Sequence, residues 1–117
     1  MKWQLCGPID IAVDDETMRK AFAKAKRMLY VRGASAADIW SPPEHVPSSM
    51  TAQCAAAKRI AHIAHGGADI ARGVGALTLV TLPKWEQSAS ARLEVEVAKA
   101  VGVPVVTFED AARMVGA

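Results

Sequence analysis

The fold is decided by the stretch 76–108, which reads ALTLVTLPKWEQSASARLEVEVAKAVGVPVVTF. It begins with a β-prone run that continues to Leu82 and stops at a proline, which is typical of a buried strand. After a short loop, Ser88 or Ser90 can cap a helix that ends before Gly102. The apolar run that follows predicts a second strand. The order strand, helix, strand favours a parallel crossover unit.

The rest of the chain alternates in the same way. The other expected elements are a strand at Trp3–Cys6, a helix that starts near Asp14 and runs from Thr17 to Gly33, a weaker strand at Ala36–Trp40, a helix at Ala52–His65 that Gly66 and Gly67 interrupt, a short turn or helix at Ala68–Arg72, and a closing helix at Glu109–Val115. No hairpin signal is present. We therefore expect an α/β fold, a small Rossmann-like or flavodoxin-like parallel sheet of about four to five strands with helices on both faces.

Composition narrows the class of protein. The 117 residues fit one domain, 1–117, and a hydrophobic content of 51% is enough for a packed core. The net charge of +2 comes without a basic run, so we expect no nucleic-acid partner. No apolar segment is long enough to cross a membrane, and no secretory leader is evident. The two cysteines suggest no disulfide scaffold, which favours a cytoplasmic protein.

Ligands of open parallel sheets bind beyond the carboxyl ends of the strands. Three expected loops meet at that edge, Gly7–Asp14, Ser41–Ser49 and Pro83–Ser88. Gly7 would let a ligand approach the backbone closely, although a plain strand-to-helix turn explains Gly7 and Pro8 more readily. No dinucleotide or phosphate-loop glycine motif is present, and we expect no cofactor.

Histidines offer little support for a metal site. His62 and His65 stand three residues apart on an alanine-rich helix, and His45 lies in a separate loop. No third ligand is evident beside the helical pair, so we expect no metal ion.

Two carboxylates are the candidate catalytic groups. Glu94 lies within the first turns of the helix that starts at Ser88, where the helix dipole favours an ionised carboxylate suited to nucleophilic attack. Spacing alone fits a surface glutamate more readily, as for Glu96. Asp69 follows the glycine pair and is either a helix cap or a second catalytic acid.

Together these residues resemble the nucleoside 2-deoxyribosyltransferase superfamily. The likeness rests on Cys6-Gly7-Pro8-Ile9, Asp69, Trp85-x-x-Ser88 and Ala91-Arg92-Leu93-Glu94-x-x-x-Ala98. Within the superfamily the chain is most similar to small phage and bacterial relatives and to the 2'-deoxynucleoside 5'-phosphate N-hydrolases.

The resemblance implies roles for individual residues. Glu94 would attack the anomeric carbon, and Asp69 would transfer a proton or bind the sugar. Ser88 stands where the monophosphate hydrolases carry a serine that touches phosphate, whereas Pro8 and Asp10 replace their phosphate-binding serine and arginine. The residues expected to bind substrate are Gly7, Pro8, Ile9, Asp10, His45, Trp85, Ser88 and Arg92.

The expected activity is therefore cleavage of an N-glycosidic bond in a (deoxy)nucleoside or nucleoside monophosphate. Trp85 or Trp40 would stack on the base, or pack in the core. Whether water or a second base accepts the sugar stays open. The alternative is a module that binds a nucleotide without cleaving it, favoured by Asp10 and by Glu96, which replaces a small residue of the family pattern. The resemblance also implies a homo-oligomer with sites at subunit contacts.

Overall fold

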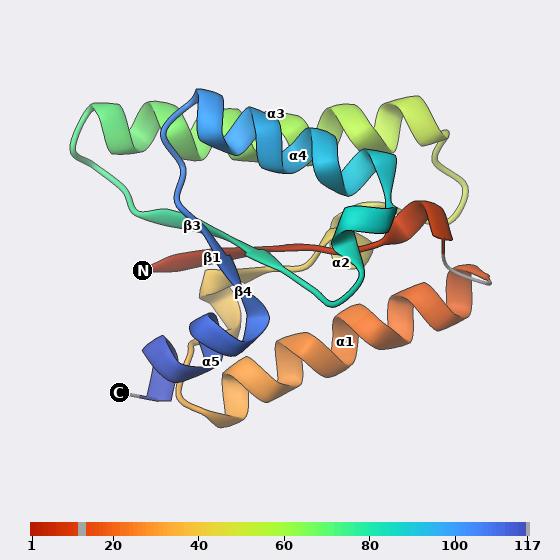
Figure 1. Ribbon diagram of the computed structural model, residues 1–117, viewed down its shortest axis with the longest axis horizontal. Coiled ribbons are helices and arrows are strands. Elements are labelled where there is room, and N and C mark those ends of the chain that lie inside the picture. Colours follow the sequence, from red (N-terminus) through yellow and green to blue (C-terminus); the bar gives the residue numbers. More distant parts are fainter. Residues whose placement is uncertain (12–13, 117) are drawn as a thin grey trace.

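The computed structural model describes residues 1–11 and 14–116. Its centre is a parallel sheet of four strands in the order β2-β1-β3-β4, made of β1 (Lys2–Cys6), β2 (Ile39–Trp40), β3 (Leu77–Thr81) and β4 (Val105–Thr107). Two helices, α3 (Ala52–Ala71) and α4 (Ala89–Ala100), cover one face, and α1 (Asp15–Val31) and α5 (Phe108–Gly116) cover the other (Figure 1). The expected α/β fold with helices on both faces is confirmed.

The two central strands set the position of the site. β1 pairs with β3 along its whole length, from Lys2 opposite Leu77 to Cys6 opposite Thr81. The chain leaves β1 for the edge strand β2 and then returns to β3 on the other side of β1. This reversal is the topological switch point where parallel sheets bind ligands. The segments that follow β1 and β3 therefore emerge side by side.

Side chains of β1 alternate between two apolar cores. Trp3 and Leu5 face α1 and α5 and pack with Phe22 and Leu29. Cys6 faces the α3 and α4 layer, in a core that includes Ile63, Leu79, Ala91 and Val95. This alternation follows from the two-residue period of a strand. The second core surrounds the residues of the candidate site.

Helix α3 runs unbroken through Gly66 and Gly67, so the expected interruption is wrong. A Cβ at Gly66 would overlap the side chain of Leu77 in β3. A Cβ at Gly67 would lie 2.6 Å from Cγ2 of Val101, just past the end of α4. The glycines do not end the helix; they allow it to pack closely on β3 and α4.

Other boundaries also differ from the expectation. The strand expected at Ala36–Trp40 is a 3-10 turn, η2 (Ala36–Asp38), followed by the two residues of β2. The loop expected at Ser41–Ser49 contains one helical turn, α2 (Pro42–His45), which begins with two prolines suited to a helix start.

Helix starts follow the expected caps. The Asp14 side chain accepts a hydrogen bond from the Thr17 amide at 2.7 Å at the start of α1. Ser88 caps α4 by accepting from the Ala91 amide at 3.3 Å. A short turn, η3 (Trp85–Gln87), leads from β3 into this cap, and a similar turn, η1 (Ile9–Ile11), follows β1.

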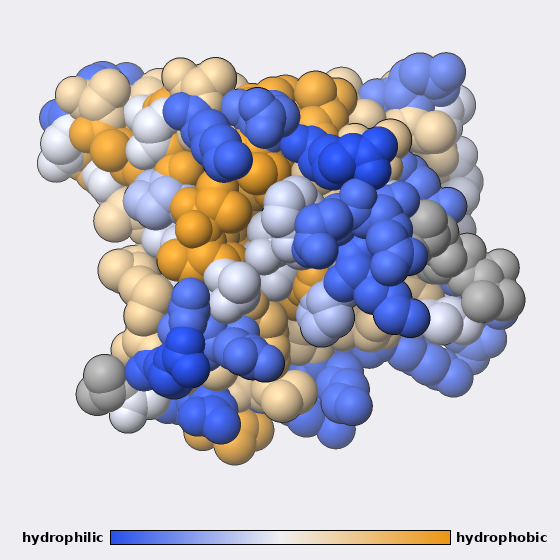
Figure 2. Space-filling view, viewed as in Figure 1, coloured by the Kyte–Doolittle hydropathy of each residue, from blue (hydrophilic) through white to orange (hydrophobic). Residues whose placement is uncertain are grey.

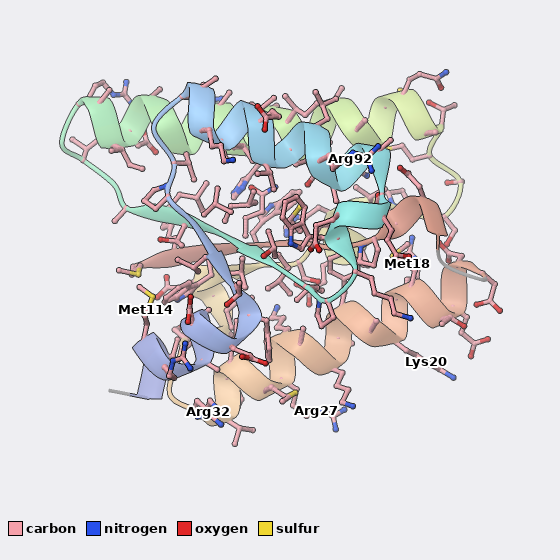
Figure 3. All side chains as sticks on the ribbon, in the orientation of Figure 1. Met18, Lys20, Arg27, Arg32, Arg92 and Met114 are labelled. Carbon is pink, nitrogen blue, oxygen red and sulfur yellow. The ribbon has the colours of Figure 1, made fainter. Side chains whose placement is uncertain are left out.

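The surface is polar around α1 and more hydrophobic near β4. Lys20, Arg27 and Arg32 point away from the sheet (Figure 3). Hydrophobic residues gather around the edge strand β4 in the view of Figure 2, between patches of hydrophilic residues. Within residues 1–11 and 14–116, none of the helices combines the length and the apolar character that crossing a membrane requires.

Candidate functional site

Glu94 lies in the second turn of α4 and points into the core rather than toward solvent. Its side chain is 2% exposed. Glu94 lies on the same face of α4 as the buried residues Ala91, Val95 and Ala98, so helical spacing places its side chain in the core. A buried carboxylate is rare unless it is paired or functional. The expectation from spacing alone, a surface glutamate, does not describe this side chain.

Arg59 of α3 is the partner of this carboxylate. Its Nε donates a hydrogen bond to Oε2 of Glu94 at 3.1 Å, and the Arg59 side chain is 5% exposed. Oε1 of Glu94 is also buried, but it has no hydrogen-bond partner among the described residues. Buried polar atoms nearly always have a partner, so this oxygen is a candidate contact for a ligand or substrate.

Burial raises the pKa of Glu94 to about 7, and the attraction of Arg59 offsets only part of this effect. Burial, followed by the nearby Glu94 carboxylate, also raises the pKa of Cys6, whose thiol donates to the backbone oxygen of Ala91 at 3.6 Å. The carboxylate therefore changes charge near neutral pH beside a thiol that stays protonated. A group with such a pKa can act as a base or a nucleophile at physiological pH.

The segments after β1 and β3 meet at Asp10. One carboxylate oxygen of Asp10 accepts from the Ser90 amide at 2.7 Å and from the Ser88 hydroxyl at 3.1 Å. The other accepts from the Ser90 hydroxyl at 2.8 Å. Partial burial raises the pKa of Asp10, but the hydrogen bonds from Ser90 and Ser88 outweigh it and lower the pKa overall. An ionised carboxylate thus occupies the N-terminus of α4, where the helix dipole stabilises it.

A hydrogen-bond chain connects Arg59 to an aromatic cluster. The buried Gln4 donates from Nε2 to the Arg59 carbonyl oxygen at 3.2 Å, and its Oε1 lies 2.5 Å from Nδ1 of His62. His62 and His45 both stack on Trp40, with ring centroids 4.3 and 4.6 Å apart. Burial lowers the pKa of both histidines, which favours neutral rings.

Several sequence-predicted residues therefore lie together. Asp10 of η1 contacts Ser88 at the switch point, and Ser88 caps the helix that carries Glu94. Trp85 is half-buried against the core around Cys6, and Arg92 lies beside η3, where it donates to the Glu86 carbonyl oxygen at 2.6 Å (Figure 3).

Others are placed apart from Glu94. Asp69 lies almost three turns beyond Arg59 on α3, a rise of about 15 Å. It pairs with Arg72 at 2.5 Å on the surface. His45 stacks on Trp40, as described above.

The first loop is occupied by packing contacts. A Cβ at Gly7 would lie 2.9 Å from the ring of Phe22, so this glycine makes room for a core side chain. Ile9 packs against the same core, and the half-buried Pro8 lines a hollow on that side of the sheet.

Arg59 and Gln4 were missed by the sequence reasoning, although a signal existed for Arg59. It stands at four-residue spacing between Ala55 and Ile63, on the stripe that α3 buries. A charged residue on such a stripe needs a buried partner. Gln4 lies between Trp3 and Leu5 in a central strand, where alternation places it on the opposite face from both.

Two hollows lie near this region but do not include Glu94. One, of about 550 Å³, lies between α1 and the segments after β1 and β3 and is lined by Pro8, Phe22 and Lys84 among others. The second, of about 410 Å³, includes Trp40, His45 and His62. In the part of the chain that the structure describes, no cluster of three or more His, Cys, Asp or Glu side chains could hold a metal ion.

Comparisons with known proteins give one match. A family model described as "Domain of unknown function (DUF4406)" matches residues 1–107. No curated protein and no solved structure matches the chain.

Proposed function

We propose that this chain, which belongs to the DUF4406 family of domains of unknown function, cleaves the N-glycosidic bond of a (deoxy)nucleoside or nucleoside monophosphate, with Glu94 as the nucleophile. The observation that carries the proposal is the carboxylate itself: Oε2 is held by Arg59, and the buried Oε1 has no partner among the described residues. An oxygen in this state suits attack on an anomeric carbon.

The proposed reaction has two steps. Oε1 forms a bond to C1' while the bond from C1' to the base nitrogen breaks through an oxocarbenium-like transition state. The base leaves with the electron pair and takes a proton from solvent. Water, or a second base, then attacks C1' and loses a proton to solvent while the bond from C1' to Oε1 breaks, which releases the sugar and restores the carboxylate of Glu94. Asp69 pairs with Arg72 well away from Glu94, so Asp69 does not serve as the acid of this reaction.

Substrate access requires a change in the site. Glu94 is 2% exposed, so a sugar reaches Oε1 only after the covering side chains move. The segments after β1 and β3 meet beside it through Asp10 and Ser88, and we propose that this edge opens when substrate binds.

Free-base release from a panel of deoxynucleosides and their monophosphates tests the proposal, with the bases separated by chromatography. Glu94→Gln removes the nucleophile while keeping its shape, so release should fall to the background rate. Glu96→Gln is the matched control, because Glu96 is exposed on the same helix, and release should be retained. Release that persists undiminished in Glu94→Gln would overturn the assignment.

A second candidate is a module that binds a nucleoside or nucleotide without cleaving it. It is favoured by the same buried Oε1, which a bound hydroxyl could satisfy, and by the surface position of Asp69. Saturable binding of panel members without base release, weakened by Glu94→Gln, would favour this candidate over the enzyme.

We also propose that the chain self-associates. Leu93, on the helix that carries Glu94, is 51% exposed, and hydrophobic residues gather around the edge strand β4 (Figure 2). Sedimentation that shows only monomers at micromolar concentration would contradict a site shared between subunits.

A further inference from the structure

We infer that Arg59 is the positioning residue of this site: it holds Oε2 of Glu94 and thereby leaves Oε1 as the oxygen that attacks. The inference rests on the proposed glycosidic cleavage. The contact is a buried Nε to Oε2 hydrogen bond of 3.1 Å, and no other described residue bonds either carboxylate oxygen. A carboxylate fixed through one oxygen presents the other in a single direction.

Arg59 is itself held in place by β1. Its carbonyl oxygen only accepts hydrogen bonds, so the Gln4 amide nitrogen must face it. Oε1 of Gln4 consequently faces His62, whose Nδ1 must then carry the proton. Gln4 therefore connects Arg59 and His62, which lie one turn apart on α3, to the central strand β1. The backbone of Arg59 is therefore tied to the sheet as well as to its own helix.

The charges around Glu94 give Arg59 a second effect. Three neighbouring elements present titratable or charged groups to the carboxylate: Arg59 from α3, Asp10 from η1 and Cys6 from β1. Asp10 is an anion and the Cys6 thiol is neutral, so Arg59 is the cation of this set. Without it, the ionised form of Glu94 would be buried with no compensating charge, which is strongly unfavourable. Arg59 thus keeps Glu94 ionisable near neutral pH.

Removal of Arg59 would shift the titration of Glu94 even if the ion pair were purely structural, whereas only the loss of a positioning residue also changes how fast a bound substrate reacts. Titration of the Glu94 carboxyl carbon by NMR measures the electrostatic effect of Arg59 and needs no turnover, so it does not depend on the proposed activity. Arg59→Met should raise the midpoint by about one pH unit or more, equivalent to a tenfold smaller ionisation constant. Lys58→Met, at an exposed neighbour on α3, should leave it unchanged.

The conservative variant supplies the second readout. Arg59→Lys keeps the positive charge but loses the planar Nε donor, so the Glu94 midpoint should stay nearer to that of the wild type. In Arg59→Lys, the kcat of base release at pH 9 should fall at least tenfold with little change in KM, because the orientation of the Glu94 carboxylate is lost. A Glu94 midpoint that is unchanged in folded Arg59→Met would overturn the inference. If Arg59→Met does not fold, the inference would be overturned by an Arg59→Lys protein whose kcat equals that of the wild type at every pH.

Discussion

Nε of Arg59 lies 3.1 Å from Oε2 of Glu94, and the second oxygen of the same carboxylate is buried without a partner among the described residues. The two side chains come from adjacent parallel helices, α3 and α4, on one face of the sheet (Figure 1). A buried ion pair seldom adds stability over a hydrophobic pair of the same volume. Its presence here, with one oxygen unsatisfied, favours a role in binding or chemistry.

The titration of Glu94 predicts how stability depends on pH. The pKa in the folded protein, about 7, lies above the ordinary value of 4.5, so the fold favours the protonated form. The stability from this group is fully present below about pH 4.5 and is lost as the pH rises through 7. Relative to Glu94→Gln, the free energy of unfolding of the wild type should fall between pH 5 and 8 by up to about 3 kcal/mol. Urea unfolding of both proteins at the two pH values measures this difference, and parallel pH profiles would contradict it.

The close packing of α3 predicts that alanine is not tolerated at its glycines. Gly67→Ala gains about 1 kcal/mol in helix propensity. The added methyl group would lie 2.6 Å from Val101, and this overlap should cost more than the gain, for a net loss of about 1–2 kcal/mol. Thermal unfolding of Gly67→Ala and of the wild type shows whether the substitution lowers or raises stability. Ala64→Gly, at an exposed position of the same helix, is the control and should lose about 1 kcal/mol from propensity alone. A Gly67→Ala protein more stable than the wild type would show that the helices are not in this contact.

Asp10 is expected to hold the start of α4. Asp10→Ala removes hydrogen bonds from Ser88 and Ser90 and a negative charge at the helix N-terminus, and should destabilise the protein by about 2 kcal/mol. Asp14→Ala provides a comparison, because Asp14 accepts one backbone bond at the start of α1 and its loss should cost about 1 kcal/mol. Urea unfolding measures both. Equal losses of stability in the two variants would mean that the hydrogen bonds from Asp10 of η1 contribute no more than an ordinary helix cap.

Much of the fold could be predicted because the signals were local. The β-prone run before Pro83, the serine cap at Ser88 and the stop at Gly102 each depend on neighbouring residues. The effect of the glycine pair in α3 could not be predicted, because the reason for these glycines is not local. Gly66 and Gly67 make room for Leu77 and Val101, which are distant in sequence.

The site was predictable only in part, for the same reason. The contact of Asp10 with Ser88 follows from the edge at which parallel strands end. Arg59 and Glu94 lie on the buried faces of two different helices, and the sequence alone does not predict which helix faces pack together. The resemblance to the nucleoside 2-deoxyribosyltransferase superfamily implied that Asp69 assists Glu94 by transferring a proton or binding the sugar, whereas the structure pairs Asp69 with Arg72.

The role of Glu94 is tested most directly by the mass of the protein quenched in acid during turnover of a deoxynucleoside or monophosphate from the panel. The proposed mechanism predicts a mass gain equal to that of the sugar less one water, located on Glu94 by peptide mapping and absent from Glu94→Gln. Base release by the wild type with no adduct on Glu94, and undiminished release in Glu94→Gln, would contradict it.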